Sequence, residues 1–545
     1  MSAKNAFKGV QDLLEAGYEK APWFHDVIRT ANKQRMNREQ ALRVAARFHA
    51  EYEVRPPAEP EVERFSARDL VMAGHEPAPW FDGYIAEVER RGLSMSQALK
   101  HAPAARQAWL DAQPKTISLQ EGVPIQVNMT AEDEFERQNM ELVVDSFREL
   151  ARTPTVLAGA IMPDACMAGS RGSITVGGVI GAKGAIHPGM HSADVCCSMF
   201  VTVLDTSDAD RVLDAAAGIT HFGPTGRTDG RFTLPRDLEA RFRANPLLDD
   251  GRILRAATVQ LGSQGDGNHF FYVGRMADDR VAIVTHHGSR GVGGMLYKKG
   301  MRIAEDFRER LSPETLKANA WIPIESKEGE AYWEALQITR AWTKENHRVL
   351  HDAVADELGL QIDRRLWNEH NFVFREDDVF WHAKGATPIH NAFLPDTEGV
   401  QIVPMNMAQP ILLVSGERTA TNLGFAPHGA GRNLSRTQHK RLKAGKTDAE
   451  IFAEETAGID ARFFCNRIDI SELPSAYKDA DSVQRDMERF GLCRVVERIQ
   501  PYGCVMAGDI ELEAPWRKKR PEVNDREETY DEPEVEEDED AAPGF

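Results

Sequence analysis

The sequence lacks a long hydrophobic segment. No run of about 18 apolar residues occurs among its 545 residues, so we expect no membrane-spanning helix. The first residues, Met-Ser-Ala-Lys-Asn-Ala-Phe-Lys, also lack the apolar core of a secretory signal. Together these absences predict a cytoplasmic protein with no membrane partner.

Cysteine is scarce as well. The six cysteines are Cys166, Cys196, Cys197, Cys465, Cys493 and Cys504. They are too few and too scattered for a disulfide scaffold. In a chain without an export signal we expect them to be free thiols or metal ligands.

The common phosphate-binding loops are missing. Gly445-Lys446-Thr447 resembles the end of a P-loop, but Lys440 stands where that motif requires its first glycine. No G-x-G-x-x-G segment opens a clear strand–helix–strand unit. If the protein binds a nucleotide, it must do so in another way.

An excess of positive charge is also missing, since the net charge is −19, which by itself disfavours a nucleic-acid partner. The distribution weakens that objection. Residues 509–545 hold 15 acidic and 5 basic residues, so this tail accounts for −10 and the other 508 residues for −9. Basic residues are dense at 432–436 and 440–446. The tail is rich in Glu, Asp and Pro, and we predict that it is disordered.

Residues 1–112 contain an internal repeat. A shift of 57 positions aligns Ala21-Pro22-Trp23-Phe24 with Ala78-Pro79-Trp80-Phe81, and fourteen residues are identical over positions 12–45. This predicts two small helical units, at about 10–55 and 67–110, each with a helix starting at the Pro-Trp-Phe segment and a second helix after it. We expect each Trp-Phe pair to form a core; RNA docking or oligomerisation is the other interpretation. Residues 56–61 are the predicted linker.

From about residue 116 the pattern changes. Residues 117–127 are strand-like and residues 131–153 suit a long amphipathic helix. Short Val/Ile runs then alternate with glycine, which favours a mixed sheet whose loops carry a site. Further helices are predicted at 298–311, 329–358 and 483–490, and a strand at 493–498.

Residues 425–436 are a strong candidate for the chemistry. His428 lies next to Gly429, Ala430 and Gly431, and Arg432 and Arg436 follow. Glycine amides can approach an anion closely and arginine grips phosphate. A histidine held beside a phosphate can act as nucleophile, acid or metal ligand. A plain glycine-rich turn is an equally good interpretation of this stretch alone.

Metal-ligand residues recur in the loops. Asp194 and Cys197 pair one hard with one soft ligand, and a thiolate can bridge two divalent ions. His269 and His286 lie at expected strand ends, and His370 follows Glu369. Each histidine alone is more often structural. Together, however, the five residues would fill the coordination shells of two ions, and His428 would be left to form a covalent bond.

Taken in order, these segments resemble the RtcB family of RNA-splicing ligases. The matching segments are Met162-Pro163-Asp164, Asp194-Val195-Cys196-Cys197, Gly267-Asn268-His269-Phe270, His286-His287-Gly288-Ser289-Arg290-Gly291, His370-Asn371, Lys384-Gly385-Ala386-Thr387, Pro427-His428-Gly429-Ala430-Gly431-Arg432 and Pro501-Tyr502-Gly503. The resemblance covers about residues 117–508 and leaves out the repeats and the tail. It implies a single α+β catalytic domain at 116–508, with mixed β-sheets and flanking helices.

The resemblance implies a GTP- and manganese-dependent RNA ligase. Such an enzyme joins a 2′,3′-cyclic phosphate or 3′-phosphate end to a 5′-hydroxyl end, in broken or spliced RNA such as tRNA. His428 would be the nucleophile that takes GMP. The ligands of two Mn²⁺ ions would be Asp194, Cys197, His269, His286 and His370. Contacts to GTP or RNA phosphate would come from Asn268, Arg290, Asn371, Lys384, Gly429, Ala430, Gly431 and Arg432.

Several positions depart from the family pattern. Ala165-Cys166 stands where a histidine is usual, Ser192 where a glycine is expected, and Tyr272 where a glutamate is common. A lysine near the C-terminus is replaced by Met506 or Ala507. The metal and nucleophile positions are retained while the nucleoside positions differ, which indicates a divergent member with an altered nucleotide preference or a repair substrate.

Two other functions stay open at this stage. The same ions could serve a dimetal phosphoesterase or RNA end-processing enzyme without a covalent nucleotide. Alternatively, the chain could be a non-catalytic RNA-binding protein whose repeats supply the affinity. The sequence also leaves open a separate activating protein as a further partner.

Overall fold

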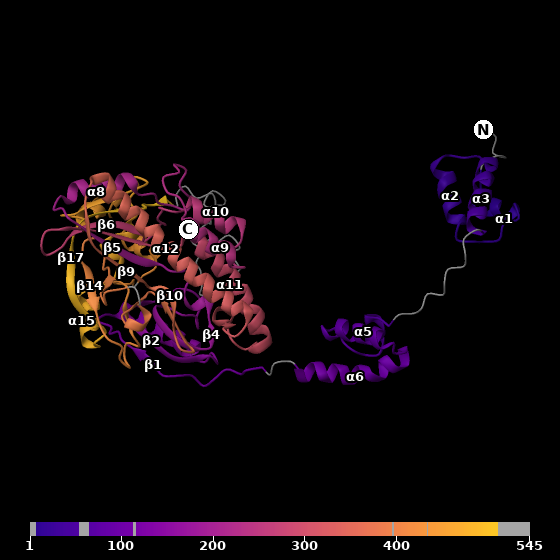
Figure 1. The fold of residues 1–545 in the computed structure, drawn as a ribbon, viewed down its shortest axis with the longest axis horizontal. Helices are drawn as coiled ribbons and strands as arrows, with labels where there is room; N and C mark the ends of the chain where they lie inside the picture. The colour runs from indigo at the N-terminus through magenta and orange to yellow at the C-terminus, as the bar shows by residue number, and fades with distance from the viewer. Residues whose placement is uncertain (1–6, 54–64, 113–115, 395–396, 433, 511–545) are drawn as a thin grey trace. The chain divides into compact units, whose positions relative to one another are not determined.

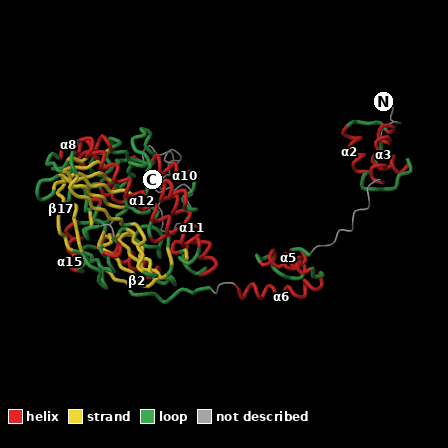
Figure 2. The backbone as a smooth tube through the Cα atoms, viewed as in Figure 1, coloured by secondary structure: helices red, strands yellow, loops and turns green. Residues whose placement is uncertain are grey.

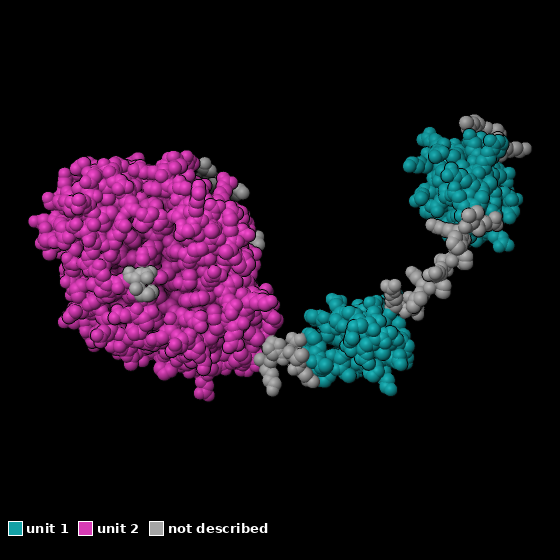
Figure 3. Space-filling view, viewed as in Figure 1, with its two compact units in different colours: residues 1–113 teal, residues 114–545 magenta. Residues whose placement is uncertain are grey.

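The computed structural model describes residues 7–53, 65–112, 116–394, 397–432 and 434–510. The chain divides into two compact units, residues 1–113 and 114–545 (Figure 3). The predicted linker at 56–61 lies outside the described residues. Of the predicted disordered tail at 509–545, residues 511–545 also lie outside the described residues.

Each N-terminal repeat contains three described helices with a core of its own. The first has α1 (Val10–Glu15), α2 (Phe24–Lys33) and α3 (Arg38–Glu53); the second has α4 (Ala67–Met72), α5 (Trp80–Arg91) and α6 (Met95–Ala112). The sequence predicted two helices per repeat. The short first helices, α1 and α4, were missed because six residues are too few to show a helical period.

The Trp-Phe pairs fill these two cores. Trp23 and Trp80 are each 5% exposed, and each ring meets the following Phe24 or Phe81 ring edge-on at 4.8 Å between centroids. Aromatic pairs in this arrangement add packing energy beyond the area they bury. The pairs therefore stabilise their own repeats and are not exposed for docking.

Residues 114–545 are built around two larger sheets (Figures 1 and 2). The five-stranded sheet has the order β1 (Ile125–Val127), β2 (Val156–Cys166), β3 (Val176–Lys183), β11 (Val379–Lys384), β10 (Asn371–Glu376). The eight-stranded sheet has the order β13 (Gln401–Val403), β14 (Ile411–Ser415), β17 (Arg494–Met506), β6 (Phe270–Arg275), β7 (Val281–His287), β5 (Ser198–Leu204), β9 (Ile362–Glu369), and β16 (Asp460–Phe463) pairs with β17.

Two short strand pairs complete the sheet structure. They are β12 (Ala386–Pro388) with β15 (Phe425–Pro427), and β4 (Ala185–Ile186) with β8 (Ile322–Pro323). Strand β12 contacts β3 of one large sheet and β9 and β13 of the other, while β15 contacts β2. The β12–β15 pair therefore lies where the two sheets meet.

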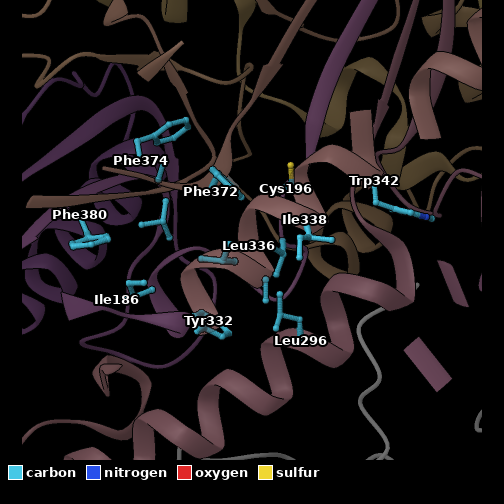
Figure 4. Packing of buried hydrophobic residues seen from close by; sticks show 14 of the residues in the cluster. Ile186, Cys196, Leu296, Tyr332, Leu336, Ile338, Trp342, Phe372, Phe374 and Phe380 are labelled. Carbon is cyan, nitrogen blue, oxygen red and sulfur yellow. The ribbon is translucent and has the colours of Figure 1, made fainter. Parts of the chain in front are cut away.

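The helices of this unit surround the sheets. They are α7 (Glu134–Leu150), α8 (Ala209–Ile219), α9 (Arg236–Ala244), α10 (Gly251–Val259), α11 (Arg290–Leu311), α12 (Lys327–Leu358), α13 (Arg436–Leu442), α14 (Asp448–Glu455) and α15 (Ala480–Arg489). Helices α8 and α12 pack on one face of the eight-stranded sheet. The largest apolar core joins α11 and α12 to both sheets, and Figure 4 shows Cys196, Leu336 and Phe372 within it. The predicted α+β class is confirmed.

Some predicted boundaries differ from the structure. The strand-like stretch at 117–127 pairs only over β1, because Ile117 and Gln120 donate to the carbonyls of Leu311 and Arg152. Helix α11 begins at Arg290, not at residue 298. Its first turns contain several glycines, which lower helix propensity and hid the pattern. No helix within the described ranges combines the length and apolarity needed to cross a bilayer.

Candidate active site

Four of the five predicted metal ligands lie at one end of four neighbouring strands. Cys197 and His269 each directly precede a strand, β5 and β6, while His286 is near the end of β7 and His370 directly follows β9. These strands are antiparallel neighbours in the order β6, β7, β5, β9. Because neighbouring strands run in opposite directions, the starts of β6 and β5 lie at the same edge of the sheet as the ends of β7 and β9. The backbone hydrogen bonds therefore bring the four side chains together.

The ligand atoms form two groups that share Cys197. Its Sγ lies 3.2 Å from His286 Nε2 and 3.5 Å from His269 Nε2. His286 Nε2 lies 3.2 Å from His370 Nε2, and His269 Nε2 lies 3.3 Å from Asp194 Oδ2. Within each group, all ligand atoms lie within 4.8 Å of one another. One shared sulfur between two such groups is the arrangement needed to hold two ions.

Asp194 reaches this cluster from the loop before β5. Its carboxylate lies against Gly288, where an added Cβ would be 1.9 Å from Oδ1. A side chain at position 288 would therefore force this carboxylate to move from its place in the cluster. Burial by itself raises the pKa of the Asp194 carboxyl. The hydrogen bond with His269 lowers it, and the net result is a pKa below the usual value.

Two histidines of the cluster, His286 and His370, are held neutral, and His286 is also oriented by a hydrogen bond. Burial lowers the pKa of His286 to about 3, and it lowers the pKa of His370 well below the usual value. His286 Nδ1 lies 3.0 Å from the Asn268 carbonyl oxygen, which fixes the proton on Nδ1 and leaves Nε2 as the ligand atom. Neutral imidazoles with this orientation are ready to bind a cation.

The donor set fits divalent metal ions. Imidazole and carboxylate suit Mn²⁺, and the thiolate adds a softer donor that also suits Zn²⁺. Burial and the neighbouring Asp194 carboxylate raise the pKa of the Cys197 thiol well above its usual range. The thiol therefore needs a cation beside it to lose its proton, and ion binding would be coupled to proton release.

His428 lies beside this cluster but is anchored to the other sheet. It follows β15, and its ring centroid is 4.9 Å from that of His370. Its Nδ1 lies 2.5 Å from Oδ2 of Asp164, a fully buried residue of β2. The same oxygen accepts the backbone N–H groups of His428 and Gly429 at 3.0 and 3.3 Å. A proton held on Nδ1 leaves the Nε2 lone pair for attack.

The loop after His428 depends on one glycine. Gly431 has φ of +74°, and an added Cβ would lie 2.1 Å from the Asp164 carbonyl oxygen. Both the left-handed backbone and the lack of space exclude a side chain. Gly431 therefore brings the loop against the strand that carries Asp164.

These groups share a cavity of about 290 Å³ between the two sheets. Of the predicted residues, its lining includes Asp194, Cys197, Asn268, His286, His370, Asn371, Lys384, His428, Gly429, Ala430, Gly431 and Arg432. Burial lowers the pKa of Lys384 to about 8, and its Nζ donates to the carbonyls of Ala168 and Ile174. A candidate nucleophile, most of the candidate metal ligands and cationic groups thus border one space.

Comparison with known proteins identifies the family. Residues 236–507 match the family model described as tRNA-splicing ligase RtcB. The chain is 28% identical over 317 residues to the tRNA-splicing ligase RtcB of Methanocaldococcus jannaschii, covering 50% of this chain and 31% of that protein. It is 30% identical over 290 residues to the RNA-splicing ligase RtcB of Mycobacterium bovis, covering 47% and 66%. This chain belongs to the RtcB family. It spans about one third to two thirds of the length of these RtcB relatives.

Two residues expected from the RtcB resemblance are absent from the cavity lining: His269, which belongs to the metal-ligand cluster, and Arg290. Arg290 does not line the cavity: its Nη2 donates to the Gly223 carbonyl and its Nε lies 3.5 Å from Ser263 Oγ. Its backbone is left-handed, with φ of +53°, where α11 begins. A contact of Arg290 with the nucleotide or RNA stays a prediction.

Two residues of the site were missed by the sequence reasoning. Asp164 lies within a matching RtcB segment, but no role was predicted for it. An aspartate inside an apolar run is a signal of a buried carboxylate that is paired with another group. Glu472, 2% exposed, contacts both Arg432 and Arg436 and accepts a hydrogen bond from the Tyr477 hydroxyl. Nothing in the sequence around Glu472 indicated this role.

Proposed function

We propose that this protein is an RNA ligase that joins a 2′,3′-cyclic phosphate or 3′-phosphate end to a 5′-hydroxyl end, using GTP and two Mn²⁺ ions. The observation that best supports this proposal is the position of His428. Its ring lies between the Asp164 carboxylate and the metal-ligand cluster, in one cavity. The RtcB relatives, named as tRNA- or RNA-splicing ligases, support the RNA substrate.

In the first step, His428 Nε2 attacks the α-phosphorus of GTP. The bond from that phosphorus to the bridging oxygen breaks and pyrophosphate leaves, so that GMP is bonded to Nε2. Asp164 keeps the Nδ1 proton and stabilises the charge on the ring. When bound, the metal ions neutralise phosphate charge as it develops.

The next two steps transfer GMP and then release it. An oxygen of the RNA 3′-phosphate attacks the phosphorus of the adduct, and the bond to Nε2 breaks. The 5′-hydroxyl oxygen of the second RNA end then attacks the RNA 3′-phosphorus, GMP leaves, and the hydroxyl proton passes to solvent. A cyclic phosphate end first consumes one water molecule to become a 3′-phosphate.

Phosphate contacts in this proposal come from the loop after His428 and from the cavity walls. Arg432 and the amides of Gly429, Ala430 and Gly431 lie next to the nucleophile. Asn268, Asn371 and Lys384 line the remaining polar wall. Residues 116–508 are the catalytic domain, the two repeats are accessory, and the reaction takes place in the cytoplasm.

The test is covalent labelling of the full-length protein with Mn²⁺ and α-labelled GTP. Wild type should retain label on a denaturing gel, and His428→Ala should not, whereas the exposed control His101→Ala should label normally. Labelled wild type should also join a 3′-phosphate RNA to a 5′-hydroxyl RNA. An unlabelled wild type would refute the proposal. Cyclic-phosphate hydrolysis that survives His428→Ala but not Cys197→Ala would instead indicate a dimetal phosphoesterase.

A further inference from the structure

The cavity has an apolar floor that begins at a metal-ligand histidine. Across the eight-stranded sheet, His286 on β7 pairs directly with Phe270 on β6, and Phe270 pairs directly with Met506 on β17. Directly opposed residues of antiparallel strands point to the same face. All three line the cavity, so a row of side chains leads from the metal cluster over Phe270 to Met506.

The floor continues with a second pair and a third strand. Tyr272 pairs with Cys504 on the same face, and Ile411 comes from β14. The Tyr272 hydroxyl already donates to the Ile499 carbonyl at 3.1 Å. Burial raises the pKa of Cys504 to about 12, so its thiol is uncharged. The sheet therefore presents carbon and sulfur atoms to the cavity and no ionised group.

Two methionines join the floor from the β13–β14 loop, on either side of a polar residue that also lines the cavity, Asn406. Met405 and Met407 line the cavity and are 4% and 8% exposed. Asn406 between them accepts the Ala408 N–H with its Oδ1 at 3.0 Å. Three thioethers, those of Met405, Met407 and Met506, border this part of the cavity. Thioethers adapt to rings of different shape. The charged residues of the lining, Asp194, Lys384, Arg432, Arg436 and Glu472, all come from other segments.

We propose that this apolar floor holds the base of the activating nucleotide by ring contact without reading its hydrogen-bonding edge, so that ATP and GTP serve His428 alike. The proposal deepens the ligase function above and rests on it. A site built to pair polar atoms rejects an unsuitable ligand by about 10⁴-fold or more, whereas an apolar pocket discriminates by about 10- to 100-fold. Purines bury more ring area than pyrimidines, so CTP and UTP should bind more weakly.

Equilibrium binding tests this inference independently of catalysis. The probes are GTP, ATP, CTP and UTP, titrated with Mn²⁺ into the full-length His428→Ala protein, which cannot form an adduct. The expected dissociation constants of GTP and ATP lie within about tenfold of each other. A preference for either purine above about 100-fold, or no binding of either, overturns the inference. Labelling of wild type by GTP alone would also overturn it while leaving the ligase function intact.

A matched pair of variants locates the base. Met506→Gln adds a carboxamide that can pair with a base edge, and Met506→Leu keeps an apolar side chain of similar size. The glutamine should change the ratio of the GTP and ATP dissociation constants by about fivefold or more, and the leucine should leave that ratio unchanged. If Met506→Gln fails to fold, Met407→Gln gives the same measurement. A ratio that no glutamine variant moves would show that the base lies elsewhere.

Discussion

Asp164 Oδ2 and His428 Nδ1 lie 2.5 Å apart, although 264 residues separate them in the chain. The carboxylate belongs to the five-stranded sheet, whereas most of the metal ligands lie along one edge of the eight-stranded sheet. The contact therefore holds His428, the proposed nucleophile, from the five-stranded sheet and beside the ligand cluster of the other sheet. The proposed chemistry therefore needs side chains from both sheets of this unit.

We expect Asp164→Asn to slow formation of the GMP adduct by about 100-fold or more. A carboxamide can donate to Nδ1, which would move the ring proton to Nε2 and remove the attacking lone pair. The rate of labelling with α-labelled GTP measures this. Asp145→Asn, an exposed carboxylate on α7, should label at the wild-type rate. An Asp164→Asn rate within threefold of wild type would contradict the role of Asp164.

Metal stoichiometry should depend on which ligand is removed. Calorimetric titration with Mn²⁺ should give two sites in wild type and one in His370→Ala or in Asp194→Ala, since each belongs to one group only. Cys197→Ala should weaken both sites because its sulfur belongs to both groups.

The neighbouring thiol is the control for this series. Cys196 is fully buried in the apolar core with α11 and α12 (Figure 4). Cys196→Ala should therefore lower stability but keep two Mn²⁺ sites. Two unchanged sites in Cys197→Ala would refute the shared-sulfur arrangement.

Glu472 should act by positioning the two arginines. Its buried carboxylate lies 3.5 Å from Arg432 Nη1 and 2.7 Å from Arg436 Nη2. In Glu472→Gln the guanidiniums lose this partner, so the KM for GTP in adduct formation should rise about tenfold, a change of about 1.4 kcal/mol. Mn²⁺ stoichiometry should stay at two.

Glu454 is exposed and pairs with Lys446 on the surface. Glu454→Gln should therefore leave the KM for GTP unchanged. A lower KM in Glu472→Gln would mean that Glu472 competes with phosphate for the arginines and does not position them.

Acid should destabilise the large unit through histidines outside the metal cluster. Burial lowers the pKa of His187 and of His191 to about 4 each. In the unfolded chain the pKa of histidine is about 6.5. Below pH 6.5 these two histidines therefore bind protons in the unfolded chain but not in the folded protein. The stabilisation is complete above pH 6.5 and is lost as the pH falls toward 4, by about 2 kcal/mol for each histidine at pH 5.

Denaturant unfolding between pH 7.5 and 5 measures this loss. His187→Gln should reduce the slope of unfolding free energy against pH, whatever its effect on absolute stability. The exposed His101→Gln should have the wild-type slope. Equal slopes in wild type and His187→Gln would be inconsistent with a buried neutral His187.

The sequence carried enough information for the α+β class, because local patterns determine it. The metal-ligand residues could be selected from their residue types and from the family resemblance. Cys197, His269 and His370 each lie directly beside a strand end, but only the pairing of the strands brings these ends together. The partner of His428 could not be predicted, because Asp164 reaches it only through the pairing order of the strands. The direction of the Arg290 side chain could not be predicted for a related reason: it depends on a left-handed backbone that the sequence does not reveal.

The pairing of His286 with Phe270 has a consequence for changes of chain length. Strands β6 and β7 are joined by the short turn at 276–280. If an insertion there slid one strand past the other by a single position, the inward and outward sides of the moved strand would be exchanged. Either the imidazole or the aromatic ring would then point toward α8 and α12. Loop-length variation, usually harmless at a surface hairpin, should thus be selected against at this one.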